Sequence, residues 1–136
     1  MKTNMIRNVS LALLAAASMF AQVFPKIEVN VPFGFHVGDT MLPAGQYSVD
    51  TQMRPDIIRV RSADTSQSVA ILTNGGGRMT RDTKPKLVFN RYGDQYFLSQ
   101  VWAPDTYAAR ELPKTKRELQ EARNTRPSHE SIIAGK

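Results

Sequence analysis

The residues from Lys86 to Trp102, KLVFNRYGDQYFLSQVW, carry the clearest structural signal in the chain. Two runs rich in aromatic and aliphatic side chains are separated by Gly93 and Asp94. A two-residue loop that begins with glycine is typical of a primed turn, whose twist matches that of two paired strands. The pattern therefore predicts a β-hairpin with the pairs Tyr92–Gln95, Arg91–Tyr96, Phe89–Leu98 and Leu87–Gln100.

A strict alternation of side chains runs from Ile27 to Val37. Every odd-numbered residue is apolar, and the even-numbered ones are Glu28, Asn30, Pro32, Gly34 and His36. This period of two predicts a strand with one buried face and places His36 on the polar face. Because Pro32 has no backbone N–H to donate, we expect the strand at a sheet edge or bulged around residues 32–34.

Three further strands are predicted between these two regions. Tyr47 and Val49 form the inward face of the first, and turn residues at Arg54–Asp56 separate it from a strand at Ile57–Arg61. The next strand, Ser68–Thr73, is apolar on both faces, so we expect it at the centre of a sheet.

The composition changes after Asp105. Residues Arg110–Asn124 are rich in Arg, Lys and Glu, with Pro113 suited to a first helical turn. The apolar face of this segment is thin, which predicts an exposed, marginal helix, and residues from Thr125 onward are expected to fray. The fold class expected is all-β, a mainly antiparallel sandwich or open barrel of about six strands over residues 26–103, with a short C-terminal helix.

The first residues have the layout of an export signal. Met1–Asn8 contains Lys2 and Arg7 and no acid, and Val9–Phe20 is almost wholly apolar. An uncleaved membrane anchor is the alternative, but a spanning helix needs about 20 apolar residues and this run is broken at Gln22. We therefore expect a signal peptide at 1–21, a β-domain at 22–105 and a charged helical tail at 106–136, in an exported protein, periplasmic or secreted, with no transmembrane span once the signal is removed.

The composition of the chain excludes some kinds of functional site and indicates a basic surface. It contains no cysteine, which excludes thiol nucleophiles, cysteine zinc sites and disulfides. The net charge is +6 from 18 basic and 12 acidic residues, and removing Lys2 and Arg7 with the signal leaves +4. No run of five cations occurs, so a basic soluble surface is the simpler interpretation.

Several short segments together resemble a group of small exported bacterial proteins of uncharacterised function. These segments are Val31–Phe33, Leu42–Val49 (LPAGQYSV), Leu87–Leu98 and Arg110–Pro113. The resemblance extends over most of the chain after the signal and implies an exported, mainly β protein. It implies no activity and no functional residues.

No catalytic, metal-binding or cofactor-binding set of residues emerges from the sequence. The two histidines, His36 and His129, are far apart in the chain, and the Gly-x-Ser-x-Gly motif of serine hydrolases is absent. His36 with Asp39 would be at most half of a metal site, and a solvent-facing histidine beside a turn is the favoured interpretation. A hydrolase that uses scattered carboxylates stays open as an alternative, because their separation is set only in three dimensions. The candidates are Glu28, Asp39, Asp50 and Asp56.

One anion-binding site can be proposed from the sequence. Three consecutive glycines followed by arginine resemble a nest of backbone N–H groups around an anion, although a flexible loop is the favoured interpretation. The proposed residues are Arg59, Arg61, Gly76, Gly77, Arg78 and Arg81. For an exported protein the partner would be an acidic polysaccharide or a lipid headgroup rather than nucleic acid. A stacking surface for sugars is a further alternative, although aromatic residues at strand spacing usually belong to a core; its residues are Tyr92, Tyr96, Phe97 and Trp102.

The sequence features together predict a general class of function rather than a specific activity. We expect a non-enzymatic exported domain with a structural, envelope or protein-interaction role, whose partner is an envelope polymer or another protein. A binding module for an anionic glycan or lipid headgroup and a hydrolase remain as alternatives.

Overall fold

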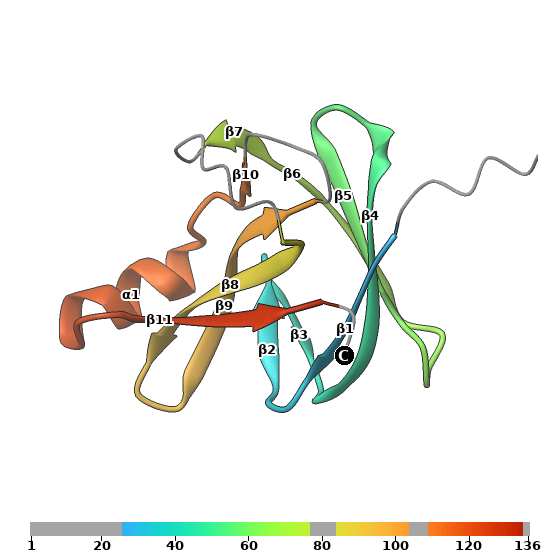
Figure 1. Ribbon diagram of the computed structural model, residues 1–136. Coiled ribbons are helices and arrows are strands. Elements are labelled where there is room, and N and C mark those ends of the chain that lie inside the picture. The colour runs from blue at the N-terminus through green and yellow to red at the C-terminus, as the bar shows by residue number, and fades with distance from the viewer. Residues whose placement is uncertain (1–25, 77–83, 104–108, 135–136) are drawn as a thin grey trace, which may run out of the picture.

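The computed structural model describes residues 26–76, 84–103 and 109–134, which form two β-sheets packed face to face and one helix (Figure 1). The expected all-β sandwich with a short C-terminal helix is confirmed, with eleven strands in the described residues where about six were expected. One sheet contains β1 (Ile27–Val31), β4 (Gly45–Arg54), β5 (Ile57–Ser62) and β6 (Ser68–Leu72). The other contains β2 (Phe35–Val37), β3 (Thr40–Leu42), β7 (Asn74–Gly76), β8 (Lys86–Tyr92), β9 (Gln95–Trp102), β10 (Ala109–Glu111) and β11 (Ser128–Ile133).

The alternating segment Ile27–Val37 forms two strands rather than one. The ladder stops at Pro32, and the chain crosses from β1, at the edge of the four-stranded sheet, to β2 in the seven-stranded sheet. The expected edge position is confirmed, and the break falls where proline cannot donate a hydrogen bond. The apolar positions of both strands are at most 1% exposed, so the expected buried face is confirmed. The alternation in burial holds for β1 only, because all three residues of β2 are buried.

The four-stranded sheet has the order β1-β4-β5-β6 and is antiparallel throughout. The expectation that Ser68–Thr73 is a central strand is wrong, because β6 lies at the edge. Only Val69 and Ile71 pack against the core, whereas Leu72 is 60% exposed. Apolar side chains on both faces therefore did not indicate burial on both faces.

The seven-stranded sheet is built on the predicted hairpin, now β8 and β9. Tyr92 pairs with Gln95 and Phe89 with Leu98, as expected, and Gly93 has the positive φ of 62° that a primed turn requires. Beyond Phe89 the register shifts by one residue, so that Leu87 lies opposite Val101 and not Gln100. The additional residue is Ser99, whose carbonyl accepts a hydrogen bond from the N–H of Leu112 at 2.9 Å.

The other strands add to both sides of this hairpin. The strand order is β11-β8-β9-β10-β7. On the side of β9 that faces away from β8, β10 pairs with Gln100 and Val101. The β2–β3 hairpin lies along the same side of β9, through a parallel contact between His36 and Phe97. The turn between β2 and β3 requires glycine at Gly38, where φ is 59° and a Cβ would lie 2.7 Å from Cδ1 of Ile71.

The C-terminal segment differs most from expectation. The helix α1 covers Lys116–Asn124 and begins only after Pro113, because residues 109–111 form β10 instead. Thr115 is its N-cap and accepts a hydrogen bond from the N–H of Glu118 at 3.2 Å. The expected fraying from Thr125 is wrong: β11 pairs with β8 along six residues.

The core lies between the two sheets and draws on both. Its buried members include Val29, Val49 and Val60 from one sheet and Phe35 and Phe89 from the other. In the LPAGQY segment the hydroxyl of Tyr47 donates to the carbonyl of Pro43, so the tyrosine closes the turn that leads into β4. No helix among the described residues is both long and apolar enough to cross a membrane.

Candidate functional site

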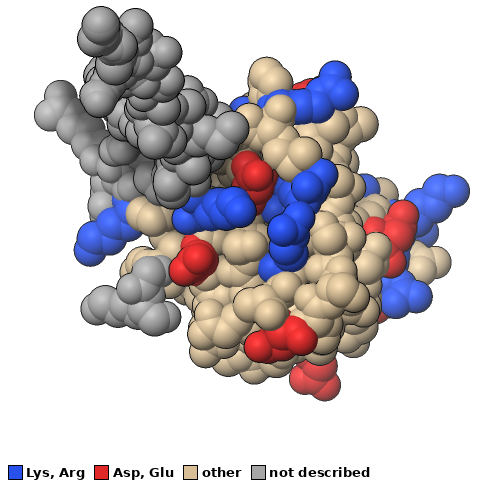
Figure 2. Space-filling model, turned by 90° about the vertical axis from the view of Figure 1, so that its right-hand side faces the viewer, with Lys and Arg blue, Asp and Glu red and all other residues tan. Residues whose placement is uncertain are grey.

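The outer face of the four-stranded sheet gathers three basic side chains. The pairing of β4 with β5 places Arg59 opposite Asp50 and Arg61 opposite Ser48. These four residues and Lys26, which directly precedes β1, line a shallow hollow of about 20 Å³. Lys26, Arg59 and Arg61 are called the basic cluster below. Figure 2, which views the right-hand side of Figure 1, shows lysine and arginine side chains near the middle of this face, with acidic neighbours.

The basic cluster is not neutralised from within. In the part of the chain that the structure describes, none of its three cations forms an ion pair. The neighbouring Asp50 instead accepts a hydrogen bond from the backbone N–H of Gln52 at 2.9 Å. The three cations therefore remain available to a ligand, beside a carboxylate and a hydroxyl group that can accept hydrogen bonds.

The structure brings together two of the six residues proposed from the sequence. Arg59 and Arg61 share one face of β5, as their spacing of two predicts. Gly76 lies in the other sheet, where β7 pairs with β10, and a Cβ on Gly76 would lie 2.3 Å from Cδ of Glu111. A carboxyl group of the chain itself thus covers Gly76. Gly77, Arg78 and Arg81 lie outside the described residues.

Lys26 was missed by the sequence reasoning, although a signal for it exists. It directly precedes the alternating run and lies two residues before Glu28 and four before Asn30, so the period of two places its side chain on the same outward face. What the sequence could not show is that β1 pairs with β4, which in turn pairs with β5. That order brings Lys26 towards the two arginines.

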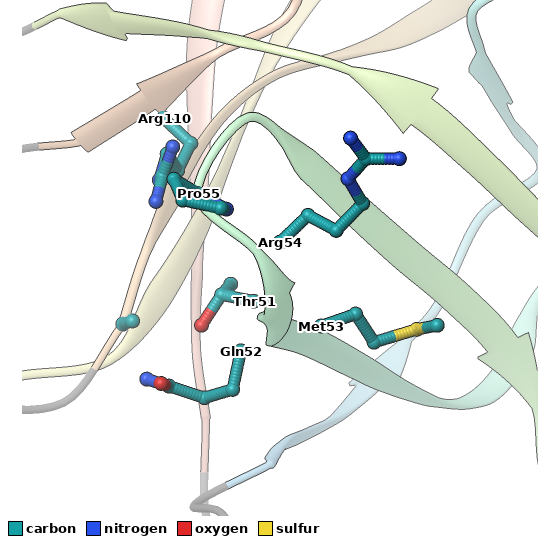
Figure 3. Close-up of a pocket in the computed structure, with 7 residues that line it drawn as sticks. Thr51, Gln52, Met53, Arg54, Pro55 and Arg110 are labelled. Atoms are coloured by element: carbon teal, nitrogen blue, oxygen red, sulfur yellow. The ribbon is translucent and has the colours of Figure 1, made fainter.

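A larger pocket of about 310 Å³ opens where the end of the β4–β5 hairpin meets β10 (Figure 3). Arg110 lies beside Pro55 in this view, whereas Arg54 and Met53 point away from Thr51 and Gln52. The ionisable residues in the lining are arginines, and Arg54 approaches Asp56 at 4.0 Å. The pocket can therefore hold a polar ligand, but the described residues of its lining include no carboxylate or histidine that could transfer a proton.

The candidate carboxylates do not converge in the pockets of the described structure. A third pocket, of about 220 Å³, is lined by Lys26, Ile27, Glu28, Pro85 and Ala134. None of the three pockets is lined by two carboxylates, so none has the paired acids of a glycosidase. Within the described ranges no group of three or more His, Asp or Glu side chains is placed to hold a metal ion.

His36 is buried, and the expectation of a solvent-facing side chain is wrong. Only 2% of the residue is exposed, because β2 lies between β3 and β9 and the ring of His36 stacks on Phe97 with centroids 4.5 Å apart. Its Nε2 lies 3.1 Å from Oε1 of Gln95. His129, on β11, is exposed. The two histidines therefore have different environments, and His36 has a packing role.

A buried carboxylate, which the sequence reasoning missed, connects α1 to β8. Glu118 is 4% exposed and accepts hydrogen bonds from Nδ2 of Asn90 at 2.9 Å and from the hydroxyl of Tyr92 at 3.1 Å. Burial, the negative charge of Glu118 and this hydrogen bond together raise the pKa of Tyr92 to about 12. Because Glu118 lies on α1 and its two hydrogen-bond donors lie on β8, these bonds hold the helix against the sheet.

The aromatic side chains considered as a sugar platform belong to packed regions. Tyr92 and Phe97 are each 2% exposed, and Trp102 is 8% exposed. Tyr96 stacks on Phe33 with ring centroids 3.7 Å apart. The interpretation of these residues as packing residues therefore holds.

Comparison with models of known protein families finds no match, and neither does comparison with curated proteins or with solved structures.

Proposed function

We propose that the protein is an exported, non-enzymatic binding domain of the cell envelope, and that the outer face of its four-stranded sheet binds an acidic polysaccharide. The observation that carries the proposal is the basic cluster, three cations around one hollow that form no ion pair with any residue the structure describes. The layout of residues 1–21 as a signal peptide supports the location.

The shape of the site favours a polymer over a small molecule. A hollow of about 20 Å³ holds little more than one water molecule and cannot enclose a ligand. Affinity must then come from contacts distributed along an extended partner. An open sheet face with several cations suits a chain that carries an acidic group on successive units.

The composition of the site favours a glycan over a lipid surface. The lining contains no apolar side chain that could enter a bilayer. Ser48 and Asp50 instead offer oxygen atoms that accept hydrogen bonds from sugar hydroxyls, while the arginines can take carboxylate or sulfate groups. A carboxylate in the middle of the site also suits a sugar chain better than a uniform layer of phosphate headgroups.

The proposal is tested by the affinity of the purified protein for polygalacturonate, with neutral dextran as the reference polymer. We expect binding that weakens as NaCl is raised, because exposed charge contacts are screened. The double variant Arg59→Gln/Arg61→Gln should bind about tenfold more weakly, since each exposed charge contact contributes up to about 1 kcal/mol.

The matched control is Arg117→Gln/Arg123→Gln, which removes the same charge from exposed positions of α1. It should bind as the unmodified protein does. Equal losses in the two double variants would mean that net charge alone attracts the polymer, and the proposed site would be abandoned. Binding to vesicles of phosphatidylglycerol without binding to polygalacturonate would also contradict the proposal.

A further inference from the structure

The outer edge of β6 presents a row of backbone groups without partners in the described structure. The N–H of Ser62 donates to the carbonyl of Gln67 at 3.0 Å, and the N–H of Thr73 donates to the carbonyl of Asp56 at 2.7 Å. These two bonds, at opposite ends of β6, fix the phase of the antiparallel ladder. Residues 67, 69, 71 and 73 direct their N–H and C=O groups towards β5, so Ser68, Ala70 and Leu72 direct theirs away from it.

This edge lacks the features that normally prevent strands from pairing between molecules. Edge strands are usually protected by charged residues, proline or a bulge. The sequence of β6 is SVAIL, its pairing with β5 is regular, and its three outward residues are all exposed. Of the other edge strands in the described residues, β1 and β11 carry Glu28 and Glu130, and β3 and β7 have only three residues each.

We infer that two copies of the chain associate through their β6 strands, antiparallel about Ala70, to form one continuous eight-stranded sheet. In this register Ala70 lies opposite Ala70 of the other copy and Ser68 lies opposite Leu72. All the outward N–H and C=O groups of both strands then match, which gives six backbone hydrogen bonds. The match is self-complementary, as the interface of a two-fold dimer must be.

The side chains of β6 agree with this arrangement. The smallest residue, Ala70, lies on the two-fold axis, and Val69 and Ile71 stay turned towards the core of their own copy. Arg59, the neighbour of Ala70 on β5, would be three strand spacings from its counterpart, about 14 Å. That separation exceeds the screening length of about 8 Å at physiological salt, so the two basic clusters can share one face without strong repulsion.

Sedimentation equilibrium of the purified full-length protein over a range of concentrations tests the inference. We expect a reversible monomer–dimer equilibrium. Ala70→Glu should raise the dimer dissociation constant at least tenfold, because it sets two carboxylates opposite each other at the axis. In the monomer the same substitution places a carboxylate beside Arg59, so the fold should tolerate it. Asn30→Glu, an exposed change on the edge strand β1, is the matched control and should leave the dissociation constant unchanged.

A cysteine cross-link tests the register, because the chain has no cysteine of its own. Ala70→Cys would place two Cα atoms about 5.5 Å apart across the axis, within disulfide range. Leu72→Cys would place its two copies about 14 Å apart, so it should cross-link much more slowly under mild oxidation. A protein that stays monomeric up to about 1 mM would overturn the inference. So would a dimer that Ala70→Glu leaves intact, or equal cross-linking by the two cysteine variants.

Discussion

Glu118 shows how one residue changes the role of a whole segment. It lies at the third position of α1 after the cap Thr115, where an acidic side chain often returns to the cap. Here it points into the protein instead and accepts hydrogen bonds from Asn90 and Tyr92 of β8. An exposed charged helix, as expected from composition, thereby becomes a docked one.

Replacing this carboxylate should destabilise the protein strongly. Glu118→Ala leaves the buried donors of Asn90 and Tyr92 without partners, so the free energy of unfolding should fall by roughly 2–4 kcal/mol in urea denaturation. The side chain of Glu121, on the same helix, forms no hydrogen bond or ion pair with the described residues, so Glu121→Ala should change the free energy of unfolding by less than about 0.5 kcal/mol. Similar effects of the two substitutions would show that Glu118 contributes only through helix propensity.

Tyr92 should make the protein sensitive to alkaline pH. Its pKa is about 12 in the fold and about 10 when unfolded, so between these values the folded state binds more protons. Stability therefore falls as pH rises from 10 to 12, by roughly 2–3 kcal/mol for this group.

Urea denaturation of Tyr92→Phe at pH 9 and pH 11.5 tests this sign. The variant should lose less stability between the two pH values than the unmodified protein. It should still lose some, because burial and then the charge of Asp64 also raise the pKa of Tyr47. Parallel losses in the two proteins would contradict the assignment to Tyr92.

The C-terminal elements belong to the seven-stranded sheet. Residues 109–111 pair with both β9 and β7, and β11 covers the outer edge of β8. The sequence of β11, SHESII, contains two adjacent isoleucines, of which Ile132 packs against the core and Ile133 is 53% exposed. Removing the segment after Asp105 would therefore remove strands as well as the helix.

The two isoleucines allow a matched test of this docking. Ile132→Ala should lower the free energy of unfolding by about 1–2 kcal/mol, less than for a fully buried residue because its side chain is only partly enclosed. Ile133→Ala should change it by less than about 0.5 kcal/mol. Thermal or urea unfolding provides the measurement, and indifference to both changes would mean that β11 is not held against the core.

At the scale of the whole molecule, two sheets enclose one core without any disulfide. In the four-stranded sheet, the order β1-β4-β5-β6 places the basic cluster on the outer face and leaves β6 at the edge. The two proposed surfaces therefore belong to the same sheet. Their tests stay separate, because one measures affinity for a polymer and the other measures molecular mass.

Local patterns in the sequence determined most of the strands. The Gly93-Asp94 turn determined the nearby pairs of the hairpin, and the period of two determined which residues of β1 are buried, because both depend on neighbours in the chain. The shared face of Arg59 and Arg61 follows from the same period. These features need no knowledge of the rest of the fold.

Only the tertiary structure decided the features that depend on distant partners. The sheet switch after Pro32, the edge position of β6 and the docking of β11 all require knowing which strands lie next to one another. The burial of His36 and Glu118 follows from partners 59 and 28 residues away in the chain, Gln95 and Asn90. The basic cluster depends on the same cause, because Lys26 directly precedes β1 whereas Arg59 and Arg61 lie on β5, and β4 separates these two strands. A pattern confined to neighbouring residues carries no information about such contacts.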